Sequence, residues 1–200
     1  MATPTLELFW DFSSPYSYLG TTQADALAKR TGATLVWKPM LLGGVFKAIG
    51  QVEAPILTWG DAKRMHTLKD LQRWADYFGV PFRFPSRFPM NSLKAMRAWL
   101  ALPEERRAGF RERAYRAAWA EDRDLTDDAT LRELIGDGAD EILAATQRPE
   151  IKQALLDATN EAVKRGVFGA PTWIVTGRDG SEELIWGQDR IPLVERALTR

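Results

Sequence analysis

The chain has 200 residues, of which 45% are hydrophobic and 10% aromatic, enough to bury the core of a compact domain. Its 27 Lys and Arg residues balance its 27 Asp and Glu residues, so its charge gives no reason to expect a nucleic acid or an anionic membrane as partner. It contains no cysteine and one histidine, His66, which excludes disulfides, thiolate ligands and multi-histidine metal sites. We therefore expect no metal site, and any sulfur chemistry must use a sulfur from another molecule.

The amino-terminal residues lack the features of a targeting segment. They lead directly into a segment that contains Glu7 and Asp11, with neither the basic nor the apolar region of a signal peptide. No apolar stretch in the chain approaches the roughly 18 to 20 residues that span a bilayer. The sequence predicts a cytoplasmic protein that does not enter a membrane.

The first 40 residues have the pattern of a strand, a helix and a second strand. Residues 5–12 alternate in the period of a strand, and residues 16–30 carry apolar side chains at helical spacing, with Pro15 in the first turn and Gly32 beyond the end. Residues 33–38 are β-branched and aromatic, and Pro39 ends this second strand. A strand, a helix and a second strand within 40 residues predict a right-handed βαβ unit with parallel strands.

The middle of the chain changes character. Between residues 61 and 165 nearly all the periodicity is helical, which predicts an inserted helical domain with helices near 65–78, 93–100, 110–118, 126–136 and 149–166. The last part returns to strands at 172–175 and 183–186, joined by a turn through 177–180. A final helix follows, for which Asp189 is a candidate N-cap and Pro192 lies in the first turn.

Three segments can carry chemistry, and the first is Asp11 to Leu19, where a strand meets a helix. The N-terminus of a helix presents free N–H groups and partial positive charge, so the hydroxyl of Ser14 is placed to donate to a thiolate held there. The alternative is that Ser13 or Ser14 is only an N-cap, worth about 1 kcal/mol of stability.

The second and third segments lie near the carboxyl end of the chain. The Ala170–Pro171 bond, just before a strand, is a candidate cis peptide whose backbone can pair with an extended peptide ligand; the alternative is an ordinary trans proline. In the segment Trp186 to Arg190, the acid Asp189 and free N–H groups can hold the charged end of an amino-acid-like ligand. The alternative is that Asp189 is a solvated helix cap.

Together these segments, in this order around a helical insertion, resemble the 2-hydroxychromene-2-carboxylate isomerase family and the related kappa-class glutathione transferases. The segment Leu68 to Trp74 adds to the likeness, which covers nearly the whole chain. The resemblance implies an α/β thioredoxin-like fold related to the bacterial disulfide oxidoreductases, with Ser14 and Ser17 at the positions of their two cysteines. It divides the chain into a thioredoxin-like domain, residues 1–40 and 166–200, and an inserted helical domain, residues 41–165.

The resemblance also implies a site for glutathione. In the family's pattern the thiolate lies at Ser14, the glutathione backbone pairs with Ala170 before a cis Pro171, and the γ-glutamyl end is held by the segment that follows Trp186. Gln51 stands where relatives commonly have asparagine. The residues implied as glutathione-binding are Ser14, Gln51, Lys63, Ala170, Pro171, Trp186, Gly187, Gln188 and Asp189, and the candidates for a substrate carboxylate are Lys47, Arg87 and Asn91.

The activity implied by the resemblance is isomerisation through transient addition of the glutathione thiolate to a small aromatic carboxylate. The expected reaction converts 2-hydroxychromene-2-carboxylate-like substrates to trans-o-hydroxybenzylidenepyruvate-like products, with Ser14 as the catalytic residue, in a homodimer of the kind that the relatives suggest. Two alternatives stay open: a kappa-like transferase that leaves glutathione on its product, and a non-catalytic binding protein that retains the fold. Disulfide exchange is disfavoured because it requires a protein thiolate.

Overall fold

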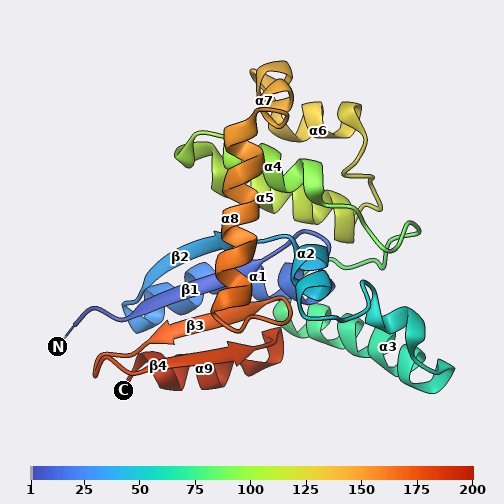
Figure 1. The fold of residues 1–200 in the computed structure, drawn as a ribbon. Coiled ribbons are helices and arrows are strands. Elements are labelled where there is room, and N and C mark those ends of the chain that lie inside the picture. The colour runs from blue at the N-terminus through green and yellow to red at the C-terminus, as the bar shows by residue number, and fades with distance from the viewer. Residues whose placement is uncertain (1) are drawn as a thin grey trace.

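The computed structural model describes residues 2–200, which are built around a four-stranded mixed sheet of order β2-β1-β3-β4 (Figure 1). The first strand, β1, pairs in parallel with β2, and Leu6 lies opposite Leu35. It pairs in antiparallel fashion with β3, which forms a hairpin with β4. These pairings confirm the predicted βαβ unit and the predicted hairpin. The strands are β1 (Thr5–Trp10), β2 (Thr34–Pro39), β3 (Thr172–Thr176) and β4 (Glu182–Trp186).

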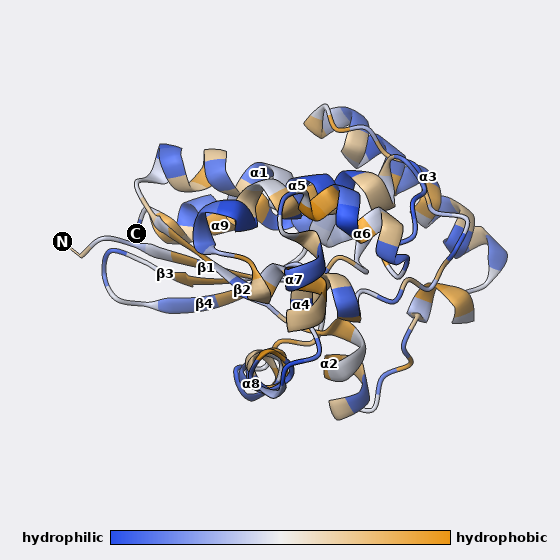
Figure 2. Ribbon diagram, turned by 90° about the horizontal axis from the view of Figure 1, so that it is seen from above, coloured by the Kyte–Doolittle hydropathy of each residue, from blue (hydrophilic) through white to orange (hydrophobic). Residues whose placement is uncertain are grey.

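Helices cover both faces of the sheet. On one side lie α1 (Pro15–Thr31) and α9 (Ile191–Leu198), and on the other lies α8 (Pro149–Lys164) (Figure 2). Gly32 ends α1 in the left-handed conformation at φ 67°, which an L side chain rarely adopts. Under α8 and α2 (Leu42–Ala48) a small core forms around Phe9, Met40 and Ile174. The central strands β1 and β3 are therefore buried between the helices, whereas the edge strand β4 is partly exposed.

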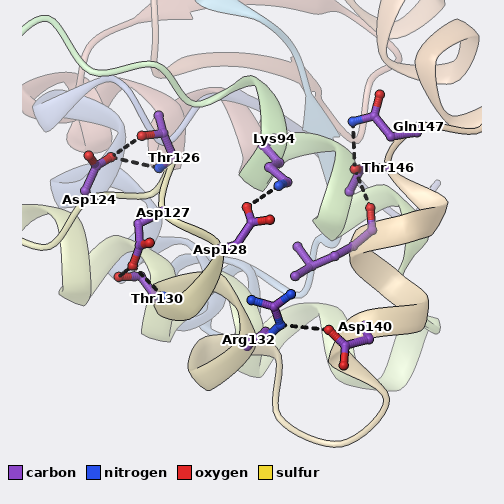
Figure 3. A network of polar contacts seen from close by, with 11 residues as sticks. Lys94, Asp124, Thr126, Asp127, Asp128, Thr130, Arg132, Asp140, Thr146 and Gln147 are labelled. Atoms are coloured by element: carbon purple, nitrogen blue, oxygen red, sulfur yellow. Dashed lines mark hydrogen bonds and ion pairs between the residues drawn. The ribbon is translucent and has the colours of Figure 1, made fainter.

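The remaining helices come between β2 and β3 in the sequence, and they form the upper and outer parts of the molecule in Figure 1. Figure 3 shows how polar contacts fix several of them: the Asp127 carboxylate caps α6 by accepting from the Thr130 N–H, Lys94 of α4 pairs with Asp128, and Arg132 pairs with Asp140. None of the helices in residues 2–200 is long and apolar enough to cross a membrane. These elements are α3 (Asp61–Phe78), α4 (Leu93–Ala101), α5 (Glu104–Trp119), α6 (Asp128–Ile135), α7 (Ala139–Ala145) and the 3₁₀ helix η1 (Pro55–Thr58).

The sheet and the inserted helices share one hydrophobic core. Trp10 at the end of β1 packs edge-on against Trp99 of α4, with ring centroids 5.2 Å apart, and Phe12 packs against Tyr115 of α5 at 4.8 Å. The Tyr115 hydroxyl donates to the Asp11 carbonyl oxygen. The insertion therefore packs directly against the turn that precedes α1.

The structure differs from the predicted elements at three places. Helices α2 and α7 were not predicted. Residues 80–92, which contain three prolines, form no helix, and no helix was predicted there. The last helix begins at Ile191, after a 3₁₀ turn, η2 (Gln188–Arg190). The prediction that Asp189 caps this helix is wrong: Arg190 occupies the N-cap position, and the Asp189 carboxylate pairs instead with the Arg190 guanidinium at 3.2 Å.

Candidate active site

A cavity of about 950 Å³ opens beyond the carboxyl end of β1. Its wall is formed by the start of α1, by α2 and the segment up to α3, by the irregular residues before α4, and by the turns on either side of the β3–β4 hairpin. The carboxyl end of a parallel strand next to a helix N-terminus is a common place for a ligand in α/β folds, because free N–H groups face it. The cavity is large enough for a drug-sized molecule.

Ser14 lies in the wall of this cavity as the N-cap of α1. Its Oγ accepts from the Ser17 N–H at 3.1 Å and donates to the Ala170 carbonyl oxygen at 2.8 Å. Pro15, which lacks an N–H, fits the first helical position that follows. Ser14 is therefore an N-cap, and the same hydroxyl also joins α1 to the turn that contains Pro171.

The turn opposite Ser14 contains the cis Ala170–Pro171 peptide, as predicted. Ala170 lines the cavity, and its N–H donates no hydrogen bond within residues 2–200. Beside it, Gly169 packs so closely on Trp186 that a Cβ at this position would lie 2.5 Å from the indole Nε1. Only glycine permits this contact, which places the Trp186 ring at the rim of the cavity.

The segment after β4 is fixed by its backbone. Gly187 adopts φ 113°, which an L side chain rarely adopts, and a Cβ there would lie 2.5 Å from Asp189 Oδ1 and displace that carboxylate. The Gly187 N–H donates to the Pro171 carbonyl oxygen at 3.0 Å, and the Trp173 Nε1–H donates to the Gly187 carbonyl oxygen. These bonds hold the Asp189 carboxylate beside the proline turn, in the cavity wall.

Asp11 forms the floor of the cavity behind Ser14. Its buried carboxylate accepts from the N–H groups of Ser13, at 3.0 Å, and Leu42, at 2.6 Å. Burial raises the pKa of this carboxyl, and the hydrogen bonds oppose that rise. Asp11 thereby joins the start of α1 to the start of α2, two elements that line the cavity.

Tyr16 lies in the cavity wall one helical position beyond Pro15. Burial, together with the charges of Asp70 and Asp189, raises the pKa of its phenol to about 12. The hydroxyl makes no hydrogen bond within residues 2–200, so it remains available as a donor to a bound molecule at neutral pH.

Comparison with known proteins agrees with this geometry. Residues 5–199 match the DSBA-like thioredoxin domain family. The chain is 30% identical over 199 residues to a 2-hydroxychromene-2-carboxylate isomerase of Sphingobium xenophagum, covering 98% of each protein. It is 29% identical over 209 residues to human glutathione S-transferase kappa 1, covering 97% of this chain and 90% of the relative. The chain belongs to the DSBA-like thioredoxin domain family.

Within that family it falls among the 2-hydroxychromene-2-carboxylate isomerases and kappa-class glutathione transferases. A solved 2-hydroxychromene-2-carboxylate isomerase structure superposes with a TM-score of 0.80 at 28% identity, covering 97% of this chain and 94% of the other. The expected family and the thioredoxin-like fold with a helical insertion are thus confirmed. The two relatives named above are an isomerase and a glutathione transferase, so the chain belongs to a family of enzymes.

The structure brings most of the predicted site residues of this family member to one cavity. Pro171 lies directly behind that wall, next to Ala170. The wall includes Ser14, Lys47, Gln51, Asn91, Ala170, Trp186, Gly187, Gln188 and Asp189.

Two predicted residues lie elsewhere. Lys63, in the first turn of α3, is absent from the wall, and its Nζ lies over the ring of Trp59, 4.0 Å from the centroid. Arg87 lines a second hollow, of about 210 Å³, together with Asp122 and Asp124. Pro89, Met90 and Asn91 line both hollows, so Arg87 lies in a hollow that adjoins the main cavity.

Sequence reasoning missed the apolar half of the wall. These side chains come from η1 and the residue after it, from α3 and from the proline-rich segment 80–92, and they make one side of the cavity suitable for a flat apolar molecule. In the sequence their only signal is a high aromatic content, which core packing explains equally well. They are Ile56, Trp59, Trp74, Phe84, Phe88 and Met90.

Proposed function

We propose that this chain binds glutathione with the sulfur at Ser14 and isomerises a 2-hydroxychromene-2-carboxylate-like substrate to a trans-o-hydroxybenzylidenepyruvate-like product. The observation that carries the proposal is the Ser14 hydroxyl, which lies in a cavity at the N-terminus of α1 in a chain without cysteine. Such a site can stabilise a thiolate but cannot supply one. Its relatives include isomerases and glutathione transferases, which supports the same assignment.

The residues present fit glutathione. The Ala170 N–H is an unused donor for the tripeptide backbone, and Asp189, which lines the same cavity, has a carboxylate that suits an ammonium group. A cavity of about 950 Å³ leaves room for a second molecule against the apolar wall. When bound, glutathione would supply the sulfur nucleophile that this chain lacks.

The chain's own contribution begins with the Ser14 proton. In the structure this proton points to the Ala170 carbonyl oxygen, while the Oγ lone pair is occupied by the Ser17 N–H. A rotation about the Cβ–Oγ bond turns the proton toward a sulfur in the cavity without breaking the helix cap. Ser14 and the α1 N-terminus then favour the charged form of that sulfur.

Lys47 and Asn91 are proposed to hold the substrate carboxylate, and Gln51 is proposed to contact glutathione. All three lie in the cavity wall, and the Lys47 ammonium makes no ion pair within residues 2–200. The apolar side chains opposite them would pack against the aromatic ring and exclude water from it. Arg87 is left out of this proposal because it lines the other hollow.

The test compares the wild-type chain with Ser14→Ala. Glutathione should bind the wild-type chain and show thiolate absorbance in the ultraviolet at neutral pH. In Ser14→Ala we expect less thiolate and a loss of kcat of about 10²-fold or more, as for other lost donors to a reacting anion. Thr22→Ala, which removes an exposed hydroxyl from the same helix, should behave as wild type.

Product analysis separates the alternatives. Mass spectrometry of an isomerase reaction should show product of unchanged mass and unconsumed glutathione. A product that retains glutathione would instead identify a kappa-like transferase, the alternative supported by the similarity to the human enzyme. Absence of glutathione binding by the wild-type chain would contradict both enzymes and leave a non-catalytic binding protein.

A further inference from the structure

Helix α2 supplies Lys47 to the cavity wall, but its own sequence supports it weakly. It has seven residues, two of which are Gly43 and Gly44, and glycine disfavours the interior of a helix. Its N-cap residue is Leu41, whose side chain cannot accept a hydrogen bond from the first turn. The position of Lys47 therefore depends on contacts from other parts of the chain.

Two buried acceptors hold the start of α2, which lies beside α8 (Figure 1). The Leu42 N–H donates to Oδ2 of the Asp11 carboxylate at 2.6 Å. The Leu41 N–H donates to the Thr159 hydroxyl of α8 at 3.0 Å. Because Asp11 and Thr159 are both buried, water cannot readily take their place. The Asp11 carboxylate thus caps α2 from a position 31 residues earlier in the chain.

The same carboxylate contacts the start of α1, but α1 has other supports. Oδ1 of Asp11 accepts from the Ser13 N–H at 3.0 Å. The Asp11 carbonyl oxygen accepts from the Ser14 N–H, at 3.2 Å, and from the Tyr115 hydroxyl, at 3.0 Å. The Ser14 hydroxyl is bonded in addition to the Ala170 carbonyl oxygen. Loss of the carboxylate should therefore loosen α2 and leave Ser14 in place.

We propose that Asp11 is a positioning residue for the substrate carboxylate, because it holds α2 so that the Lys47 ammonium keeps a fixed place relative to the Ser14 hydroxyl. This inference rests on the proposed function, which takes Ser14 as the site of the sulfur and Lys47 as a partner of the substrate carboxylate. It gives a role in binding to a fully buried acid that the proposed mechanism otherwise leaves unused.

The central variant is Asp11→Asn. The amide has the shape of the carboxylate but only one acceptor oxygen, so it cannot serve both N–H groups. Thr159→Val removes the second support of α2 and leaves the Asp11 carboxylate intact. Thr31→Val is the matched control, because it removes a buried hydroxyl that donates to carbonyl oxygens within α1. Lys47→Met removes the charge that Asp11 is proposed to position.

The experiment measures two dissociation constants by calorimetry for each variant. The first is for S-methylglutathione, which cannot react, and the second is for trans-o-hydroxybenzylidenepyruvate in the presence of saturating S-methylglutathione. Asp11→Asn and Thr159→Val should each weaken binding of this carboxylate probe about five- to tenfold, and Lys47→Met about tenfold. Thr31→Val should bind both molecules as wild type does.

Binding of S-methylglutathione should respond much less to Asp11→Asn. Of the residues proposed to contact glutathione, Gln51 follows α2 directly, and its N–H donates to the Phe46 carbonyl oxygen of that helix at 2.8 Å. Ser14, Ala170 and the segment after Trp186 lie on other elements. We therefore expect a change of about twofold or less in the dissociation constant of S-methylglutathione.

A double-mutant cycle shows whether Asp11 acts through Lys47. In the Lys47→Met background, Asp11→Asn should have almost no further effect on the carboxylate probe, because the group that it positions is gone. A general loss of structure would instead add to the loss caused by Lys47→Met. The pH dependence of the thiolate absorbance of bound glutathione should be the same in Asp11→Asn as in wild type.

Three results would overturn the inference. One is additivity of the two losses in the cycle. Another is wild-type affinity for the carboxylate probe in both Asp11→Asn and Thr159→Val. The third is a shifted pH dependence of the thiolate in Asp11→Asn with unchanged affinity for the probe, which would assign the Asp11 charge to the sulfur instead.

The test does not depend on one variant or on glutathione alone. If Asp11→Asn does not fold, the cycle of Thr159→Val with Lys47→Met decides by the same criterion of additivity. Failure of the wild-type chain to bind S-methylglutathione would refute the proposed function, and the cycle could then be measured with the carboxylate probe alone.

Discussion

At the scale of single residues, Ser14 shows how one hydroxyl can serve both stability and chemistry. Its oxygen accepts the N–H that a helix start leaves free, and its proton goes to a neighbouring carbonyl oxygen of the proline turn. Because the two hydrogen bonds use different parts of the hydroxyl, the proton can be redirected to a ligand while the cap remains. Replacement by alanine removes both functions, so its effect on stability must be measured beside its effect on activity.

Tyr16 gives a prediction about alkaline pH. Burial, Asp70 and Asp189 raise the pKa of its phenol from 10.0 to about 12, so the folded chain keeps a proton that the unfolded chain releases near pH 10. This tyrosine therefore does not affect stability below about pH 10 and lowers it progressively as the pH rises toward 12. Tyr16→Phe should lose less stability than wild type between pH 9 and pH 11, measured as the urea midpoint at each pH.

An equal alkaline loss in Tyr16→Phe and wild type would contradict the assigned environment of this phenol. At neutral pH the same variant tests function, since the neutral hydroxyl lies in the cavity wall without an acceptor in residues 2–200. A change in the affinity for S-methylglutathione would place that hydroxyl at the tripeptide.

At the scale of elements, α1 is fitted to the proline turn by Gly20. A Cβ at Gly20 would lie 2.9 Å from the Pro171 Cγ and 3.4 Å from the Trp173 ring, and neither partner is a flexible chain end. Glycine usually weakens a helix interior by about 1 kcal/mol relative to alanine, yet here it permits close packing. Gly20→Ala should destabilise the protein by about 1–3 kcal/mol and weaken S-methylglutathione binding by displacing the Ala170 turn.

Gly109→Ala is the matched control. Gly109 is also inside a helix, α5, but the atoms that a methyl group at this position would meet belong to the flexible end of Arg113. This variant should be as stable as wild type or more stable by up to about 1 kcal/mol, by the ordinary gain in helix propensity. The free energy of unfolding of both variants, measured with denaturant, tests this prediction. A stabilised Gly20→Ala would show that the contact with Pro171 can relax.

The elements also show where sequence reasoning succeeds and where it stops. Strand β1, helix α1 and the final hairpin were predicted because their periodicity and boundary residues are local. Helix α2 was missed because Gly43 and Gly44 give it low intrinsic propensity; it is held by distant partners, through the bond from the Leu42 N–H to the Asp11 carboxylate. Helix α7 has only seven residues and follows Gly138, which gave no start signal.

The candidate site also contains residues that the sequence predicts and residues that it does not. Ser14, Ala170 and Asp189 were predicted because each lies in a short contiguous motif at the end of an element. The apolar wall was not, since residues such as Trp59, Trp74 and Phe84 are brought together only by the packing of α3 and the proline-rich segment. The contact of the Lys63 ammonium with the Trp59 ring likewise depends on the path of the chain before α3.

At the scale of the whole molecule, the two predicted parts, residues 1–40 with 166–200 and residues 41–165, share one hydrophobic core. Tyr115 and Trp119 of α5 donate hydrogen bonds to the carbonyl oxygens of Asp11 and Phe12, in the turn that precedes Ser14. The buried cluster runs without interruption from the strands to the inserted helices. Neither part buries this surface alone, so we expect the two parts to stabilise each other and to unfold together.

Trp119→Phe tests that cooperativity. Trp119 is fully buried, and its Nε1–H donates to the Phe12 carbonyl oxygen at 2.7 Å, so the variant loses packing and leaves a buried carbonyl oxygen unpaired. We expect a loss of about 2–4 kcal/mol, against less than about 0.5 kcal/mol for Leu156→Ala at an exposed position of α8. Far-ultraviolet circular dichroism follows the helices, and thiolate absorbance of bound glutathione follows the Ser14 site. If the molecule is one unit, both signals shift to the same lower denaturant midpoint; a shift confined to the helical signal would show that residues 41–165 unfold by themselves.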